Sequence, residues 1–263
     1  MIASLGRFVI DYLNWIKGLI VLLMDILYWI FIGPFFKGKS AHREGIFSQM
    51  TFVGVRSIII VFFVDIFTGI VIAMQTAYQF EKMGASIYVA ALVAIALCRE
   101  LSPVLTALVV AGRVGSAIAA ELGTMKVSEQ IEALDTMAIN PVRFLAVPRF
   151  LALLFMLPCL TILGDISGIV GGFIVGTGSL HINPELYMQT TFKYLKLKDI
   201  YTGLTKSFVF AIIIALIGCF EGLNTRGGAE GVGKATTRSV VISFILIILA
   251  DCILTAFFYF SKV

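Results

Sequence analysis

The stretch SVVISFILIILADCILTAFFYF, residues 239–260, holds a single charged residue, Asp251, in an otherwise apolar or weakly polar run. A helix that crosses a bilayer needs about 20 mostly apolar residues, so this stretch predicts a membrane-spanning helix. Four other stretches meet the same requirement, namely residues 50–78, 87–112, 147–176 and 200–222. The sequence therefore predicts an all-α integral membrane protein with five spanning helices.

The composition supports this class. The chain has 263 residues, of which 59% are hydrophobic and 14% are charged, and its mean hydropathy is +1.01. A soluble domain carries roughly 25% charged residues. The basic residues are scattered through the predicted loops, so nucleic-acid binding has no support. The four cysteines lie singly within apolar runs, which indicates packing residues and neither a disulfide framework nor a metal site.

Residues 8–36 are ambiguous. They contain Asp11, Asn14, Lys17 and Asp25 at helical spacing, broadly on one side, and they end at Gly33-Pro34. This pattern is typical of a helix that lies in the membrane interface. A true span that tolerates Asp25 is the alternative.

The distribution of basic residues predicts the topology. Three basic regions are assigned to the cytoplasm by the positive-inside rule, namely residues 37–56 with Lys37 and Lys39, residues 113–149, and residues 223–238. The opposite side then receives Glu81-Lys82, residues 180–199 and the C-terminus at Val263. Lys193, Lys196 and Lys198 lie on that outer side, against the rule.

Small residues recur four apart in two spans. On a helix, positions i and i+4 share a face, and small side chains let a second backbone approach closely. We favour packing within one subunit over a dimer seam, because such patterns are common in any helical bundle. The two ladders are Gly164, Gly168, Gly172 and Gly176, and Ala107, Ala111, Gly115, Ala119 and Gly123.

Ionisable residues inside spans are costly and usually face protein or a cavity. Arg99 and Glu100 lie in the middle of an apolar stretch, directly before Ser102-Pro103, where we expect the proline to kink the helix. This pair either binds a polar head group or is satisfied by another helix; the two readings weigh equally. Of the others, Glu221 is expected to reach water and Lys206 to snorkel. The intramembrane carboxylates available as partners are Asp65, Asp165 and Asp251.

Two catalytic or nucleotide-binding readings find little support. Residues 228–234, GAEGVGK, have phosphate-loop spacing, but Ala235 replaces the magnesium-binding hydroxyl, so a glycine-rich turn is the better interpretation. An aspartyl enzyme would need carboxylates to converge, as Asp65, Asp165 and Asp251 could, yet no local signature accompanies them.

Residues 128–139 predict a short amphipathic helix between two spans. Ser128 is a suitable N-cap, acidic residues follow it, and Asn140-Pro141 ends the helix. Anionic lipid attracts basic helices, so the acidic face favours docking onto a soluble partner over resting on the bilayer. The apolar side comprises Val127, Ile131, Leu134 and Ala138.

Several long motifs, in order, resemble the MlaE family of ABC transporter permeases. They are ALCRELSPVL at 96–105, AGRVGSAIAAELGTM at 111–125, EQIEAL and MAINP between 129 and 141, and KATTRSVV at 234–241. The resemblance covers about residues 45–260. The family usually has glycine where Ser102 stands.

This resemblance implies an N-terminal interfacial region, residues 1–44, and a permease transmembrane domain, residues 45–263. It implies a homodimer in the bacterial inner membrane, two cytoplasmic ATPase subunits that bind ATP and magnesium, a periplasmic MCE-domain protein and often a small cytoplasmic regulatory protein. No cofactor is expected in this chain. The transported molecule would be phospholipid or a related lipid, moved between inner and outer membranes to maintain outer-membrane lipid asymmetry. Lipid-binding positions would be Gln75, Tyr78, Arg99 and Glu100, and ATPase-coupling positions Glu129, Ile131, Glu132, Leu134 and Asp135.

Overall fold

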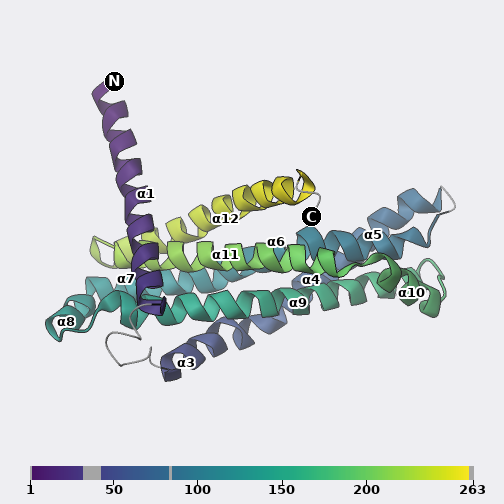
Figure 1. The fold of residues 1–263 in the computed structure, drawn as a ribbon, viewed down its shortest axis with the longest axis horizontal. Helices are drawn as coiled ribbons and strands as arrows, with labels where there is room; N and C mark the ends of the chain where they lie inside the picture. The colour runs from purple at the N-terminus through teal and green to yellow at the C-terminus, as the bar shows by residue number, and fades with distance from the viewer. Residues whose placement is uncertain (1, 32–42, 83–84, 261–263) are drawn as a thin grey trace. The chain divides into compact units, whose positions relative to one another are not determined.

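A computed structural model describes residues 2–31, 43–82 and 85–260, and within these ranges every regular element is a helix (Figure 1). Gly33-Pro34, Lys37, Lys39 and Val263, as well as the side chain of Asp11, lie outside the described residues. The α-helices are α1 Ile2–Phe31, α3 Arg43–Val53, α4 Ile58–Glu81, α5 Tyr88–Ala96, α6 Ser102–Val110, α7 Ser116–Val127, α8 Gln130–Thr136, α9 Val147–Gly178, α10 Pro184–Tyr194, α11 Leu197–Leu223 and α12 Gly228–Phe260. Between them lie a 3₁₀ segment, η1 Val55–Ser57, and three π-helical segments, η2 Leu97–Leu101, η3 Ala111–Gly115 and η4 Val142–Ala146.

The predicted class and the five spans are confirmed. Among the described residues, six helical stretches are long and apolar enough to cross a membrane: the five predicted spans and Leu13–Phe31 of α1. The helices are longer than hydropathy predicted, because a helix continues into water where its side chains turn polar. Thus α12 starts at Gly228 and not near 239, and α7 continues to Val127. Residues 113–149 and 223–238, predicted as loops, are therefore largely helical.

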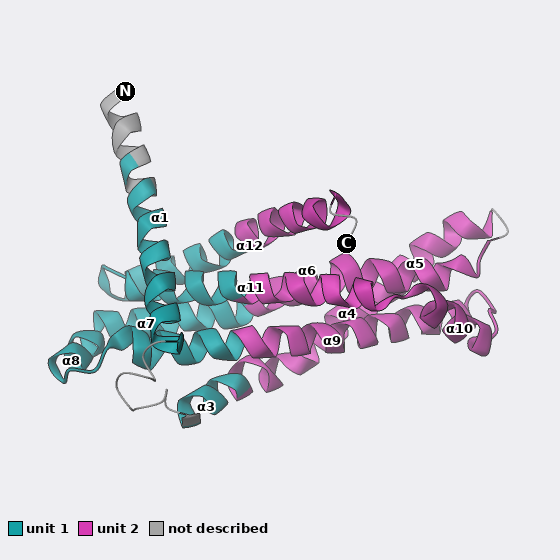
Figure 2. Ribbon diagram, in the orientation of Figure 1, with its two compact units in different colours: residues 1–50, 111–153, 212–243 teal, residues 51–110, 154–211, 244–263 magenta. Residues whose placement is uncertain are grey.

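The chain forms two compact units (Figure 2). Unit 1 comprises residues 1–50, 111–153 and 212–243, and unit 2 comprises residues 51–110, 154–211 and 244–263. The division differs from the boundary between residues 44 and 45, which stays a prediction.

Helix α1 packs within unit 1 through one face. Leu19, Leu22 and Ile26 are buried, and the Trp15 ring meets Phe220 edge-on with ring centroids 5.9 Å apart. In Figure 2, α1 runs across the neighbouring helices of unit 1 and not along them. A helix that runs across spanning helices has the orientation expected of an interfacial helix. The length of α1 also allows a true span, so both alternatives remain predictions.

Both small-residue ladders pack within the chain, which confirms the preferred interpretation. On α9, Gly168 faces the Leu97 side chain and Gly172 faces Val93 and Tyr187. In unit 1, Gly115 faces Ile214 of α11, and Gly123 lies against Thr225, which follows the end of α11. A larger side chain at these positions would collide with the neighbouring helix.

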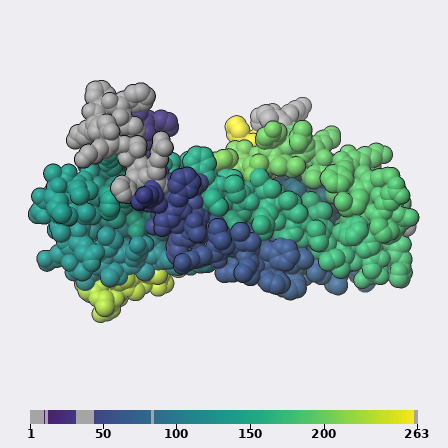
Figure 3. All heavy atoms as spheres, turned by 90° about the horizontal axis from the view of Figure 1, so that it is seen from below, coloured from purple at the N-terminus to yellow at the C-terminus, as the bar shows by residue number. Residues whose placement is uncertain are grey.

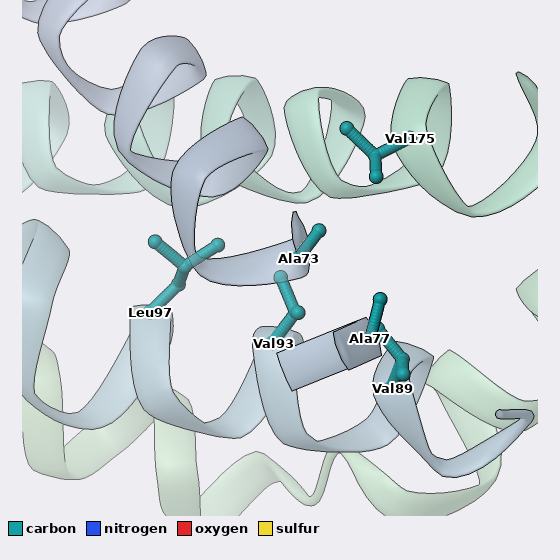
Figure 4. Packing of buried hydrophobic residues seen from close by; sticks show 6 residues of the cluster. All are labelled: Ala73, Ala77, Val89, Val93, Leu97 and Val175. Atoms are coloured by element: carbon teal, nitrogen blue, oxygen red, sulfur yellow. The ribbon is translucent and has the colours of Figure 1, made fainter. Parts of the chain in front are cut away.

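The core of unit 2 forms where α4 meets α5 and α9. Its buried members are Ala73, Ala77, Val89, Val93, Leu97 and Val175 (Figure 4). The opposite face of α4 exposes large apolar residues, including Phe63, Phe67 and Val71, and the atoms of α4 lie uncovered on the face seen in Figure 3. Such a face suits lipid or a further protein surface.

A π-helical segment lies where the proline kink was predicted. In η2 the Ser102 amide donates to the Leu97 carbonyl, five residues earlier, directly before Pro103. In η4 the Val147 amide donates to the Val142 carbonyl, directly before Pro148. A proline lacks the amide and crowds the carbonyl four residues earlier, and a wider turn relieves both problems without breaking the helix. Segments of this kind are frequent at functional sites.

Candidate functional site

Arg99 projects from η2 and pairs with Asp199 of α11. The distance from Arg99 Nε to Asp199 Oδ1 is 2.5 Å, and 44% of the arginine side chain is exposed against 5% of the aspartate. Asp199 Oδ2 also accepts from the Lys196 amide at 2.9 Å, as the third residue of a helix does in a capping box. Asp199 is thus held by its own helix and in turn orients the arginine, whose outer nitrogens are left for other acceptors.

Glu100 joins a second ion cluster centred on Lys206. The ammonium of Lys206 pairs with Glu100 and, at 2.8 Å, with Asp251, and it donates to the Thr255 hydroxyl at 2.7 Å. Thr255 in turn donates to Glu100 at 3.2 Å. The expectation that Lys206 snorkels is wrong, because its side chain is fully buried. Such partners offset the loss of hydration that a buried ammonium suffers.

Arg99 and Glu100 diverge to different partners on α11, yet both border one cavity of about 80 Å³. Since about 10–15 Å³ of this kind of volume holds one water, the cavity has room for a phosphate-sized group and not for a whole lipid. Two cations, three hydroxyls, one carboxylate and one phenyl ring surround it. The lining residues are Arg99, Glu100, Lys198, Thr202, Thr255, Phe258 and Tyr259.

The structure does not bring Gln75 and Tyr78 to this cavity. Both are exposed on α4, and neither is a lining residue. Tyr78 is 67% exposed, and its hydroxyl accepts from Lys82 at 2.9 Å. Sequence reasoning missed Asp199 and Lys198. Two features of the sequence could have indicated them. One is the basic run before the predicted span at 200–222, and the other is the position of Asp199 three residues after Lys196, the cap of that helix.

The remaining intramembrane carboxylates lie elsewhere. Asp65 Oδ2 accepts from the Thr106 hydroxyl at 3.3 Å, and the nearby Ser102 hydroxyl donates to the Thr161 carbonyl at 3.2 Å. The Gly164 backbone lies directly over the Asp65 carboxyl, so the cluster is sealed by helix packing. Asp251 belongs instead to the Lys206 cluster, so the three carboxylates do not converge.

Glu221 is buried in unit 1, contrary to the expectation that it reaches water. It accepts from the Trp15 indole at 3.1 Å and pairs with Arg238 Nε at 3.5 Å. The carboxylate therefore ties α1 and α12 to the end of α11.

The predicted coupling helix is shorter than expected. Helix α8 covers Gln130–Thr136, and Ser128 is not its N-cap, because its hydroxyl donates to the Thr124 carbonyl at 2.8 Å. Ser128 instead ends α7, and Glu129 turns the chain with a φ of 58°. The segment ends before Asn140, at Ala138, which also has a φ of 58°. Two left-handed residues thus bracket one short helix.

The predicted coupling residues divide into two groups. Ile131 is buried within the chain and anchors the segment, and Leu134 is half-buried. Glu129, Glu132 and Asp135 are exposed. A hydrogen bond from Lys126 lowers the pKa of Glu132 below its usual value. The acidic face is therefore available to a partner, whereas Ile131 is not.

The phosphate-loop spacing at 228–234 falls within α12. The turn is formed by residues 224–227, with Gly227 at a φ of 92°, and the helix starts at Gly228. The Lys234 ammonium pairs with Glu230, one turn earlier, at 2.6 Å. Interpreting residues 228–234 as a turn is therefore wrong, and a helical backbone cannot wrap around a phosphate.

Comparisons with known proteins agree with the family resemblance. The family model described as Permease MlaE matches residues 46–257. A probable ABC transporter permease protein of Rickettsia typhi is 43% identical over 210 residues, 80% of this chain and 81% of the relative. One of Synechocystis is 42% identical over 214 residues, 81% of each chain. The chloroplastic protein TRIGALACTOSYLDIACYLGLYCEROL 1 of Arabidopsis thaliana is 37% identical over 223 residues, 85% of this chain and 63% of the plant protein.

Proposed function

Because this chain belongs to the MlaE family of ABC transporter permeases, we propose that it moves phospholipid or a related lipid between the inner and outer membranes of a bacterium and so maintains outer-membrane lipid asymmetry. The chain is a multi-pass membrane protein and a transporter subunit. The Arabidopsis relative, which bears the name of a galactolipid, supports lipid as the transported class. The bacterial inner membrane is the proposed location.

The cavity beside Arg99 is the observation that carries the proposal. The Arg99 side chain is 44% exposed beside the cavity and keeps donors that Asp199 does not use, so its position suits a ligand. Asp199 occupies Nε, and the planar fork of outer nitrogens suits two phosphate oxygens. Lys198 adds a second cation and Thr202 a hydroxyl. The head group would bind here while the acyl chains lie along apolar surfaces.

ATP hydrolysis would come from a partner. A permease of this type implies an ATPase subunit, which we propose binds ATP and magnesium and contacts the exposed face of α8. A homodimer of this chain, a periplasmic MCE-domain protein and a small cytoplasmic regulatory protein complete the proposed assembly. In the dimer, Gln75 and Tyr78 would line the lipid path from the exposed face of α4.

Mass spectrometry of lipid retained by the purified complex, combined with ATP-dependent lipid transfer, tests this function. Arg99→Ala should lower phospholipid retention by about tenfold or more, since a charge-assisted hydrogen bond contributes about 1.5–3 kcal/mol. Arg99→Lys should restore only part of it, because a lysine cannot bind two oxygens in a fork. Membrane insertion should persist.

Arg226→Ala is the matched control, because this arginine is exposed in a turn of unit 1. If Arg99→Ala keeps wild-type lipid and transport but lowers thermal stability, Arg99 is a structural ion-pair residue. Absence of both lipid and a co-purifying ATPase from the wild-type complex would contradict the proposed function itself.

A further inference from the structure

Helix α10, Pro184–Tyr194, is held at the boundary of the hydrocarbon layer by its connections. The preceding spanning helix ends at Gly178 and the following one begins at Leu197. Neither connection is long enough to carry the helix far from the ends of those spans. Because α10 is both short and tethered at each end, it must lie near a membrane surface.

One face of α10 is fixed to unit 2. Tyr187 is buried, lies over Gly172 and Gly176 of α9, and meets the Phe173 ring edge-on at 5.6 Å. The Asn183 side chain caps the helix by accepting from the Glu185 amide at 2.9 Å. Burial of the Tyr187 side chain against α9 raises the pKa of its hydroxyl to about 12. The orientation of the helix, and so of its exposed residues, is set by these contacts.

The exposed flank of α10 and the start of α11 are rich in large apolar groups. Met188 and Phe192, one turn apart, are both exposed, and 69% of Phe192 is accessible. Leu197 and Tyr201, also one turn apart, are exposed as well. Amphipathic aromatic residues at this depth are typical of the interface between lipid and water.

Three lysines surround this apolar flank. Lys193, Lys196 and Lys198 are exposed, and none forms an ion pair with another described residue. The neighbouring carboxylate of Asp199 is engaged by Arg99. These are also the lysines that the predicted topology places on the outer side, against the positive-inside rule. The positive-inside rule therefore does not explain these three lysines, which indicates that they act at the surface where they lie.

We propose that α10 and residues 195–201 form a surface that binds anionic lipid head groups of the adjoining leaflet. Phe192, Met188, Leu197 and Tyr201 enter the upper acyl-chain region, and the three lysines bind phosphate groups above them. Because Lys198 also lines the cavity beside Arg99, the surface concentrates anionic lipid next to that cavity. The binding surface requires only that the chain lies in a bilayer, whereas this last consequence rests on the proposed function.

The test places a fluorophore at position 192 of the full chain, after the exposed Cys159 and Cys252 are changed to serine. A Phe192→Cys variant labelled with nitrobenzoxadiazole is reconstituted in nanodiscs of phosphatidylcholine, alone or with about 30% phosphatidylglycerol. Quenching by lipids spin-labelled near the head group should exceed quenching by aqueous iodide in both bilayers. In the mixed bilayer, native mass spectrometry should find phosphatidylglycerol enriched on the protein.

Lys193→Gln combined with Lys196→Gln leaves the cavity residue Lys198 in place. This double variant should reduce the phosphatidylglycerol enrichment by at least about fivefold, since each lysine near an anionic surface contributes roughly that factor. Lys234→Gln, which removes an exposed lysine of α12, should leave the enrichment unchanged. The fluorophore should stay buried in lipid in all of these variants.

Two results would overturn the proposal. One is preferential quenching by iodide at position 192, which would place the flank in water. The other is protection from iodide that arises only when a soluble periplasmic protein is added, which would make this surface a protein-docking site. Neither measurement uses transport, so both are independent of the proposed transport activity.

Discussion

Arg149 in unit 1 and Arg99 in unit 2 are both arginines of long helical stretches, yet their surroundings differ. The side chain of Arg149 is 5% exposed and has two acceptors, Glu121 at 2.9 Å and the Leu145 carbonyl at 2.7 Å. The side chain of Arg99 is 44% exposed, has one acceptor, and borders a cavity. A buried arginine with its charge matched is structural, whereas a half-open one with free donors can bind a ligand.

The ion pair between Arg149 and Glu121 links two helices of unit 1. It joins α7 to the start of α9, and these helices flank the segment that carries α8. Cys219 of α11 lies within electrostatic range of both charges. The ion pair therefore holds together the two helices of unit 1 between which the α8 segment extends.

Removing the partner of the buried arginine should have the largest effect. Glu121→Ala leaves Arg149 buried without a counter-charge, which should lower the free energy of unfolding by about 2–3 kcal/mol, less than for a fully buried pair because 54% of the Glu121 side chain is exposed. Thermal unfolding in detergent measures this loss. Adding Arg149→Met to the same chain should recover much of it, because two apolar groups need no partner. A double variant no more stable than Glu121→Ala would mean that the arginine stem, and not its charge, holds the helices.

The next largest loss of stability is expected from a substitution where α4 and α9 cross closely in unit 2. A Cβ at Gly171 would meet the Ile66 carbonyl, so Gly171→Ala should cost about 1–3 kcal/mol through overpacking. Gly233→Ala, on a helix with open space at that position, should instead be neutral or stabilising by up to about 1 kcal/mol. The same unfolding assay compares them. Equal behaviour of the two variants would show that α4 and α9 do not touch there.

Asp199→Asn sharpens the assignment of Arg99. The substitution keeps an oxygen for the arginine but removes the nearby negative charge, so phosphate binding should strengthen by about 1 kcal/mol, about fivefold. Lipid mass spectrometry at matched protein amounts measures this change. The Gly171→Ala variant, which disturbs the α4–α9 crossing and not the cavity lining, serves as a control for general destabilisation. Loss of lipid in Asp199→Asn would show that the full charge is needed to hold Arg99 in place.

The smallest effect is expected at the exposed Lys126–Glu132 pair beside α8. The hydrogen bond from Lys126 lowers the pKa of Glu132 in the folded protein, so any stabilisation is present above the ordinary glutamate pKa and is lost as the pH falls through the lowered value. Lys126→Gln should return the Glu132 pKa toward its usual value, with little change in thermal stability. Carboxyl carbon-13 titration of glutamate-labelled protein follows this residue, and the wild-type protein is the reference. An unchanged Glu132 pKa would mean that the pair does not form in solution.

Much of the fold was predictable from sequence because lipid imposes a strong one-dimensional rule. A backbone in hydrocarbon must satisfy its hydrogen bonds internally, so each long apolar run has to be a helix. The five spans and the intrachain packing of the glycine ladders follow from this rule and from side-chain size. The helix ends were missed because α7 and the start of α12 continue in polar residues, which hydropathy does not report.

The site was predictable only in part. Arg99 and Glu100 stand out in sequence because charges in an apolar run are rare. Their partners do not, since Asp199 and Lys206 lie about a hundred residues away and only tertiary packing selects them over Asp65 or Asp165. The same holds for Gln75 and Tyr78, which helical packing turns away from the cavity.

By itself, the sequence determined that this protein is an α-helical membrane permease, which residues carry intramembrane charge, and where a short polar helix interrupts the spans. The tertiary structure decided which charges meet, that Lys206 is sealed while Arg99 stays open, and that Ile131 anchors α8 from inside. The physical reason is that hydrophobicity acts on each residue alone, whereas ion pairing and burial depend on which distant side chains share the same space.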